Sequence, residues 1–492
     1  MLEQIKKLAG HSVLYGLGLV GSSIASMLLI PIFLHQLGRS EYGMQEVLSV
    51  FSSMLSNFLM LGLATILIKS YVTDCKTEDE RKQLISSIVI IMSVMAVLVF
   101  ILSSIFAGQL SEVLFADRRS DFLVRLAAIS GGMLLVQSMI MFFLRAKQWA
   151  VKFAVISLVQ LAVMVTLNIY LVCVRHLGVT GIQLATVVSI GISLIIGLLT
   201  IRGDLVPCVS GRMIRHVMCL ALPLFPSSVA PWVLNVSDRY FLTHYMGLSD
   251  TGLYAAGYKV GMLGITTLVS AFQMAWGPYF YNIGGKQDTP RVCAGIMKLY
   301  ILVICASGLV VSLFAPEILR VIGRREYWGA WWIVPYVGLA YIFYGAQFFT
   351  IPIFIRANQG KMLSLVMGGS AIANVAMNFV LIPRYGMRGA IVSTSISFLV
   401  QAVLSYWAAN RFYPVRYEYG NLIKVLVLAV VVYLGVTWLR IAPVPPYMLK
   451  LVGIPVFGAL LVLCRFFSEH EMHSIRNVIS KRIRLIPTKN PL

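Results

Sequence analysis

The sequence predicts an all-α integral membrane protein, and three observations support this prediction. Of its 492 residues, 59% are hydrophobic and only 12% are charged, whereas soluble domains carry about a quarter charged residues. Apolar runs of about 20 residues recur along the whole chain, and each is long enough to cross a hydrocarbon core about 30 Å thick. No segment shows the polar and apolar alternation of membrane β-strands. We therefore expect helical spans throughout.

About fourteen transmembrane helices are expected. In chain order, the predicted spans are 11–34, 44–68, 84–107, 122–145, 153–174, 182–201, 218–243, 253–277, 293–314, 330–355, 362–382, 390–409, 422–439 and 448–466. The first run is too long for the hydrophobic region of a signal peptide, and no A-x-A cleavage site follows it. We therefore expect it to be retained as a span.

Positive charge is distributed unequally between the connections of these spans. With the N-terminus placed inside, and with residues near the end of a span counted with the adjoining connection, 26 of the 40 Lys and Arg residues fall in the N-terminal segment, the even-numbered connections and the tail, whereas the odd-numbered connections hold 12. Such an excess marks the cytoplasmic side of a membrane protein, so both termini are predicted to be cytoplasmic. Although the net charge is +21, no soluble basic face is expected, and a nucleic-acid partner is therefore not predicted.

The chain lacks the sequence signatures of an enzyme or a metal site. GLGLVG, residues 16–21, fits a dinucleotide-binding pattern, but it lies inside an apolar span without a preceding strand, so close helix packing explains it better. The seven cysteines show neither a disulfide framework nor zinc-ligand spacing. A membrane enzyme that acts on glycans would usually need a large loop or a His, Asp and Glu cluster. We therefore expect no catalytic residue, no metal ion and no cofactor.

Three pairs of similar segments indicate an internal repeat. The pairs are FLHQLGRSEYG (33–43) with LTHYMGLSDTG (242–252), FLRAKQ (143–148) with FIRANQ (354–359), and GVTGIQLATVVS (178–189) with GMRGAIVSTSIS (386–397). Their offsets are 209, 211 and 208 residues. Because six spans separate the copies, the two halves have the same orientation. They are then expected to be related by a pseudo-two-fold axis along the membrane normal, with a cavity between them.

The repeat predicts four regions of the chain. Residues 1–208 form an N-terminal six-helix bundle, and residues 209–417 form a second bundle that repeats the first. Residues 418–466 supply two additional transmembrane helices, and residues 467–492 form a basic cytoplasmic tail. In that tail, SIRNVISKRIRLI has apolar residues at helical spacing, which favours an amphipathic helix on anionic lipid.

Three charged residues within the predicted spans are the main candidates for function. A charge near the middle of a bilayer costs about 2.5–3.5 kcal/mol on insertion scales, so Asp238, Arg239 and Lys259 are expected to face protein or water. Neighbouring residues lie about 100° apart around a helix, which predicts that Asp238 and Arg239 occupy different faces. Asp238 and Lys259 have similar predicted depths, so an ion pair between them is expected.

Two interpretations of these charges remain open. In the first, the ion pair is structural and fixes the seventh span to the eighth. In the second, Arg239 and Lys259 line a polar cavity and attract an anionic substrate, while Asp238 gates them or binds a coupling cation. The sequence favours neither interpretation over the other.

Further candidates lie on the fourth and tenth predicted spans. Arg145 and Arg356 occupy equivalent inner ends, where they are either ordinary flanking charges or a symmetric pair suited to bidentate phosphate binding. Tyr341, Tyr344 and Gln347 share one face of the tenth span. That face either contacts sugars or packs against another helix.

Four motifs make the chain similar to a known family. They are L-P-L-x-P at 222–226, S-D-R at 237–239, G-L-Y-A-A-G-Y-K at 252–259 and L-I-P-R-Y-G-M-R-G-A at 381–390. Because of the order and spacing of these motifs, the chain resembles the polysaccharide transporter, or O-antigen flippase, family. This family is part of the multidrug/oligosaccharidyl-lipid/polysaccharide exporter superfamily. The resemblance extends over nearly the whole chain. It implies two six-helix bundles, two extra helices and transport by alternating access.

The resemblance also implies a substrate and a location. The family moves an oligosaccharide linked to undecaprenyl pyrophosphate, such as an O-antigen, capsule or exopolysaccharide repeat unit, across the bacterial inner membrane. At matching positions, Asp238, Arg239 and Lys259 become the candidate functional charges. The expected partners are this glycan and membrane lipids, with H⁺ or Na⁺ as a candidate coupling cation. We expect a monomer.

Two other branches of the superfamily provide alternative functions. A cation-coupled multidrug antiporter is one alternative, but the first predicted span carries no carboxylate, which argues against proton coupling of that kind. A lipid II flippase is the other alternative. Its branch implies an arginine-rich first bundle, whereas the first two predicted spans here contain no internal arginine.

Overall fold

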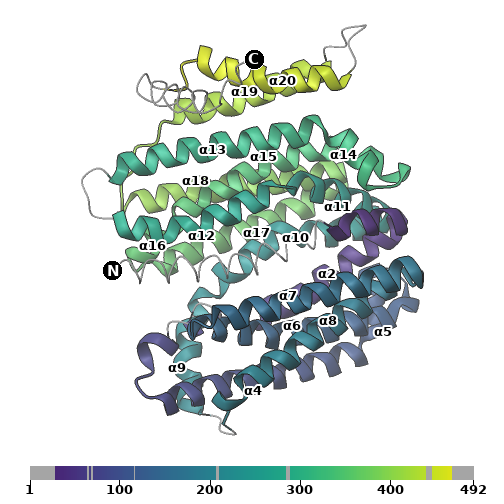
Figure 1. Ribbon diagram of the computed structural model, residues 1–492, viewed down its shortest axis with the longest axis vertical. Coiled ribbons are helices and arrows are strands. Elements are labelled where there is room, and N and C mark those ends of the chain that lie inside the picture. Colours follow the sequence, from purple (N-terminus) through teal and green to yellow (C-terminus); the bar gives the residue numbers. More distant parts are fainter. Residues whose placement is uncertain are drawn as a thin grey trace, which may run out of the picture. The chain divides into compact units, whose positions relative to one another are not determined.

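The structure, a computed structural model, describes most of the chain. It covers residues 28–63, 66–67, 70–115, 117–206, 210–283, 289–438 and 446–467. All regular elements within these ranges are helices (Figure 1). Most of the first predicted span, the GLGLVG segment and the basic tail lie outside the described residues.

Eighteen α-helices are given bounds in the described ranges. They are α2 (Arg39–Leu59), α4 (Glu78–Ile105), α5 (Ala107–Phe115), α6 (Asp121–Ala146), α7 (Ala150–Asn168), α8 (Gly178–Ile201), α9 (Gly211–Ala221), α10 (Phe225–Met246), α11 (Leu248–Met262), α12 (Ile265–Ile283), α13 (Thr289–Leu313), α14 (Ala315–Ile322), α15 (Ile333–Ala346), α16 (Ile351–Arg356), α17 (Gly360–Tyr385), α18 (Met387–Asn410), α19 (Tyr419–Trp438) and α20 (Pro446–Leu463). Seven short 3₁₀ or π-helical segments connect some of them: η1 (Ser70–Asp74), η2 (Arg118–Ser120), η3 (Ile169–Val174), η4 (Arg202–Asp204), η5 (Leu222–Leu224), η6 (Arg325–Trp332) and η7 (Gln347–Phe349).

The helices confirm a multi-span membrane protein, although not the count of fourteen spans. Ten described helical segments are long and apolar enough to cross a membrane, or eleven if α11 and α12, which meet at a 54° bend, form one span. The three remaining predicted spans are the first, which lies mostly outside the described residues, and those of α2 and α20. Helix α2 is more polar because it contains five serines and two glutamates, and α20 is short.

The described residues fall into two compact units. One comprises those within Met1–Gly284 and Ala315–Pro414, and the other comprises those within Gly285–Phe314 and Val415–Leu492. In the smaller unit, α13 packs against α19, and α20 packs against both. Nζ of Lys298, on α13, lies 3.8 Å from Oε2 of Glu418. The predicted division of the chain after residues 208, 417 and 466 stays a prediction.

The larger unit contains the described part of the first half of the sequence repeat and most of the second half, whereas α13 belongs to the smaller unit. In the first half, α6 packs against α2, α4 and α8; in the second half, α17 packs against α10 and α18. Backbone conformation follows the repeat as well. Gly178 and Gly386, at equivalent positions, open α8 and α18 with φ angles of 53° and 56°. The turns that follow α6 and α16 each contain one non-glycine residue with positive φ, Gln148 and Asn358.

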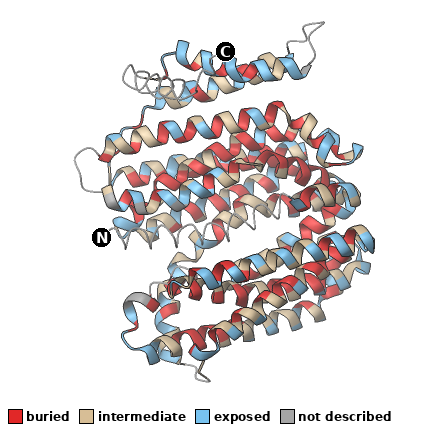
Figure 2. Cartoon of the chain, in the orientation of Figure 1, coloured by how far each residue is buried: buried red, intermediate tan, exposed pale blue. Residues whose placement is uncertain are grey.

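Helices α2 and α11 cross with their backbones in close contact. A Cβ atom on Gly43 would overlap the carbonyl oxygen of Leu248, and a Cβ on Gly252 would overlap the carbonyl oxygen of Arg39. Both pairs of equivalent residues, Arg39 with Leu248 and Gly43 with Gly252, are 209 residues apart. The contact is therefore reciprocal, as expected on a pseudo-two-fold axis. Figure 2 shows that α11 is buried along most of its length.

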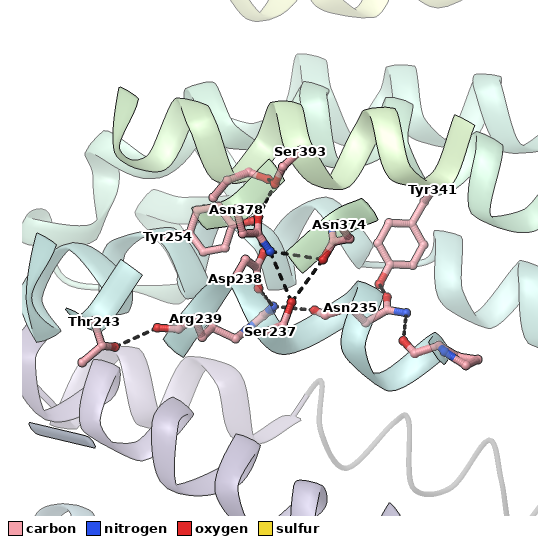
Figure 3. Close-up of polar contacts among 12 residues, drawn as sticks. Asn235, Ser237, Asp238, Arg239, Thr243, Tyr254, Tyr341, Asn374, Asn378 and Ser393 are labelled. Atoms are coloured by element: carbon pink, nitrogen blue, oxygen red, sulfur yellow. Dashed lines mark hydrogen bonds and ion pairs between the residues drawn. The ribbon is translucent and has the colours of Figure 1, made fainter. Parts of the chain in front are cut away.

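A buried polar network joins α10, α17 and α18 (Figure 3). Asn378 Nδ2 donates to Ser237 Oγ at 3.2 Å and to Asn374 Oδ1 at 3.1 Å, and Asn374 Nδ2 donates to Ser397 Oγ at 3.1 Å. The hydroxyl of Ser393 donates to Asn378 Oδ1. These hydrogen bonds satisfy buried polar groups and join the three helices to one another.

Replacement of Asn378 by leucine is expected to lower the stability of the protein. The substitution removes the hydrogen bonds that Asn378 makes with Ser237, Asn374 and Ser393, and each lost bond is expected to cost about 0.5–1.5 kcal/mol. Thermal unfolding in detergent measures the effect. Phe379→Leu is the matched control because Phe379 is 62% exposed. Equal unfolding temperatures for the two variants would contradict a stabilising network.

The glycine crossing predicts a different effect for Gly252→Ala. The added methyl group meets a backbone oxygen that cannot rotate away, so a loss of about 1–3 kcal/mol in unfolding free energy is expected. Gly369→Ala is the control, because no atom lies within 4 Å of a Cβ there, and helix propensity predicts a gain of up to about 1 kcal/mol. Chemical denaturation in detergent compares the two variants. A Gly252→Ala protein as stable as the control would rule out a tight crossing.

Candidate functional site

A cavity of about 550 Å³ lies where the two halves of the repeat meet in the larger unit. Residues of α2 line one side, and residues of α10, α11, α12 and α15 line the other. Its polar lining consists of Glu46, Ser49, Ser53, Asn235, Arg239, Tyr258, Lys259, Thr266, Thr267 and Tyr341. The volume falls within the usual range for small-molecule sites.

Lys259 forms an ion pair with a residue that the sequence analysis did not select. Its ammonium group donates to Oε1 of Glu46, on α2, and lies 5.3 Å from the centre of the Tyr42 ring. The Glu46 side chain is 8% exposed, whereas that of Lys259 is 31% exposed. This pair connects the two halves of the repeat. The predicted ion pair between Asp238 and Lys259 is therefore wrong, because Lys259 on α11 pairs with Glu46 on α2 instead.

Asp238 pairs with its own neighbour, Arg239 (Figure 3). Arg239 Nη1 lies 2.8 Å from Asp238 Oδ1 and donates to the carbonyl oxygen of Asn235 at 2.5 Å. The Tyr254 hydroxyl donates to Asp238 Oδ2 at 2.5 Å. The guanidinium group of Arg239 also lies 4.4 Å from the centre of the Tyr258 ring. The expectation that Asp238 and Arg239 occupy separate faces is wrong, because the long arginine side chain folds back along its helix.

These two ion pairs leave the cavity electrically balanced. Arg239 and Lys259 both line it, and each has a carboxylate partner. Burial removes hydration from charged groups, so a cation at this depth needs such a partner. Asp238 lies behind Arg239, with 2% of its side chain exposed. Of this pair, Arg239 and not Asp238 is among the described residues that line the cavity.

Of the three residues predicted on one face of the tenth span, Tyr341 reaches the cavity. Its hydroxyl donates to Asn235 Oδ1 at 2.7 Å, and its ring meets that of Tyr258 edge to face at 6.1 Å. Tyr344 instead packs against Phe398, at 5.0 Å between ring centres. Gln347 is buried at the start of η7. Within the described part of the chain, Tyr344 and Gln347 do not line the cavity.

The arginines at the inner helix ends lie apart from this cavity. Arg145, in the last turn of α6, packs over the ring of Phe153 with its guanidinium carbon 4.7 Å from the ring centre. Arg356, in the last turn of α16, is exposed. The described lining includes neither residue. Their role in phosphate binding stays a prediction.

Sequence reasoning missed Glu46, although one signal was present. A carboxylate at the third position of the predicted second span is as unusual as the charges at positions 238, 239 and 259. What the sequence does not reveal is which charges meet, because that depends on how the halves pack. Among the described residues, no group of three or more His, Cys, Asp and Glu side chains is placed to hold a metal ion.

Comparison with known proteins places the fold. The structure superimposes on the lipid II flippase MurJ in an inward closed conformation with a TM-score of 0.68 and 12% sequence identity, over 91% of this chain and 98% of MurJ. The MATE transporter VcmN of Vibrio cholerae gives a TM-score of 0.59 and 14% identity, over 82% of this chain and 96% of VcmN. These matches confirm the predicted all-α transporter fold.

Sequence comparison identifies the family. The chain is 19% identical to an uncharacterized membrane protein of Methanocaldococcus jannaschii over 517 aligned positions, which cover 98% of this chain and 99% of that protein. The family described as "Polysaccharide biosynthesis protein" matches residues 9–283, which is more than half of the chain. The predicted relationship to polysaccharide transporters is thereby confirmed. The chain belongs to the polysaccharide biosynthesis protein family.

Proposed function

We propose that this protein is a flippase for lipid-linked oligosaccharides. Its substrate is an oligosaccharide on undecaprenyl pyrophosphate, which it moves across the bacterial inner membrane without chemical change. One observation carries the proposal: in a chain of a polysaccharide biosynthesis family, a polar cavity with two cations lies between the two halves of a repeat. Such an interface is where transporters with internal repeats bind their substrates.

The chemistry of the cavity suits the two polar parts of such a substrate. Lys259 and Arg239 provide charge-assisted donors for the pyrophosphate. Four hydroxyl groups, from Ser49, Ser53, Thr266 and Thr267, supply hydrogen bonds for sugar hydroxyls. The rings of Tyr258 and Tyr341 offer apolar faces on the same wall. The prenyl chain needs no polar site because it stays in the bilayer.

Helix α2 supplies two contacts that can open in alternation. Near its start, Arg39 donates to the carbonyl oxygen of Glu326, and Gly43 meets α11. Near its end, Trp232 Nε1 donates to Ser53 Oγ at 2.9 Å, and the rings of Phe58 and Trp232 meet edge to face at 5.5 Å. We place both chain termini in the cytoplasm, so that the first contact closes the outer side and the second closes the inner side.

Helix α10 has a feature that suits such motion. Pro231 lies inside the helix, immediately before Trp232. A proline removes one backbone hydrogen bond and allows a helix to bend. Bending at this point would separate Trp232 from α2 without disturbing the network around Asn378. We assign the coupling role, if a cation drives transport, to Asp238, and we expect the protein to work as a monomer.

Deletion of the gene in its own host tests the function. Surface glycan is expected to disappear, and its lipid-linked repeat unit is expected to accumulate on the cytoplasmic leaflet. Expression of the wild-type chain is expected to reverse both effects. Immunoblotting of surface glycan and mass spectrometry of lipid extracts measure them. Normal surface glycan in the deletion strain, with no accumulated intermediate, would contradict the proposed function.

Loss of either cavity cation is expected to slow transport. Charge-assisted hydrogen bonds contribute about 1.5–3 kcal/mol, so Lys259→Ala and Arg239→Ala should each reduce the rate of glycan export roughly tenfold or more. Lys259→Arg keeps the charge and should retain more activity than Lys259→Ala. The exposed residue Lys361 provides the control Lys361→Ala. Full activity in both alanine variants, at normal protein levels, would show that these cations do not bind substrate.

A further inference from the structure

We propose that, before substrate binds, Glu46 occupies the position beside Lys259 that the substrate phosphate takes later. It neutralises Lys259 until an anion with more charge displaces it, and this exchange releases α2 from α11. The inference rests on the proposed function, because it takes the anion to be the pyrophosphate of a lipid-linked glycan. In this proposal, Glu46 makes the site prefer lipids that are linked to the glycan by pyrophosphate over lipids that are linked by a phosphodiester.

The geometry allows a ligand to compete for Lys259. About a third of the Lys259 side chain is exposed, whereas Glu46 is almost fully buried on the other side of the pair. Both residues line the cavity. An anion that enters the cavity can therefore reach the ammonium group directly, before any backbone movement.

The two carboxylates at the site are held to different extents. Asp238 accepts hydrogen bonds from Arg239 and from Tyr254, at 2.8 and 2.5 Å. The Glu46 carboxylate has Lys259 as its one hydrogen-bonding partner among the described residues. Two other titratable groups interact electrostatically with this pair: Tyr42, on α2, and Arg239, on α10. Glu46 is therefore the carboxylate that exchanges more easily.

The charge of the incoming group decides the exchange. A phosphodiester carries one negative charge, so its binding to Lys259 replaces one carboxylate with one equivalent anion. A pyrophosphate diester carries two negative charges and more acceptor oxygens, and Lys259 and Arg239 line the same cavity. It can engage both cations, which a single carboxylate cannot. Competition with Glu46 should thus lower the affinity of singly charged ligands more than that of doubly charged ligands.

The same exchange acts on the contact between the halves. Glu46 follows Gly43 by one helical turn, and Lys259 belongs to the helix that Gly43 crosses. When phosphate replaces Glu46, the ion pair between α2 and α11 is lost next to the glycine crossing. Substrate binding then weakens the contact that holds this end of α2 against the second half.

Ligand binding to the purified full-length protein tests the selectivity. The probes are farnesyl-pyrophosphoryl-N-acetylglucosamine and farnesyl-phosphoryl-N-acetylglucosamine, measured by isothermal titration calorimetry in detergent. Wild-type protein is expected to bind the pyrophosphate probe at least about tenfold more tightly. In Glu46→Gln, the phosphodiester probe should gain about tenfold in affinity, whereas the pyrophosphate probe should gain less.

Two variants control this measurement. Glu46→Asp keeps the charge and should keep the preference for pyrophosphate. Glu41→Gln alters an exposed carboxylate on the same helix and should leave both affinities unchanged. A merely structural Glu46 would lower the yield of folded protein without raising affinity for either probe. Unchanged or weaker binding of the phosphodiester probe to folded Glu46→Gln would overturn the inference.

Distance measurements separate this inference from the proposed function. Spin labels at Val113 on α5 and Val321 on α14, both exposed, report the separation of the two halves in a background without native cysteines. Glu46→Gln should shift the distance distribution without ligand, whereas wild-type protein should shift only with the pyrophosphate probe. If wild-type protein binds neither probe, the proposed function fails, but a shift in Glu46→Gln still supports the ion-pair lock. Unchanged distances in Glu46→Gln overturn the lock, whichever function holds.

Discussion

The close crossing of α2 and α11 is the constraint on which the rest of the site depends. Because Gly43 and Gly252 lack side chains, the two helices meet backbone to backbone. This approach brings Glu46 within reach of Lys259 and places residues from both halves around one cavity. A larger residue at either glycine would hold the helices apart and break that pairing. The repeat matters here because both sides of the crossing come from equivalent positions.

The second half combines a rigid part with a part that can move. Asn374 and Asn378 on α17, with Ser397 on α18, form a hydrogen-bonded network that binds α10 at Ser237, so several polar contacts hold these helices to one another. Among the described residues, the contacts between the halves include an ion pair, hydrogen bonds from Arg39 and from the Trp232 indole, and edge-to-face rings. Such contacts can be broken and remade at low cost. The fold therefore favours movement between the halves rather than within them.

The sequence predicted more of the fold than of the candidate site. Apolar run length predicted a helical membrane protein and the repeat predicted two related halves, because both features can be found directly in the sequence. The count of fourteen spans was not confirmed. Helix α2 contains Glu46 and five serines, and it is not among the described helices that are apolar enough to cross a membrane. Partners of charged residues were predicted wrongly for Asp238 and Lys259. Pairing depends on side-chain reach and on how the halves pack, and neither property is encoded in spacing along one helix.

The electrical balance of the cavity has a consequence for energetics. Asp238, Arg239, Glu46 and Lys259 together carry no net charge, so a movement that carries all four together across the membrane field transfers no charge. A pyrophosphate-linked cargo would add two negative charges to the moving body. An interior-negative membrane potential drives anions outward, with about 2.3 kcal/mol per charge for each 100 mV. The membrane potential would thus favour the outward movement of the loaded protein. It would neither favour nor oppose the return movement of these four residues without substrate.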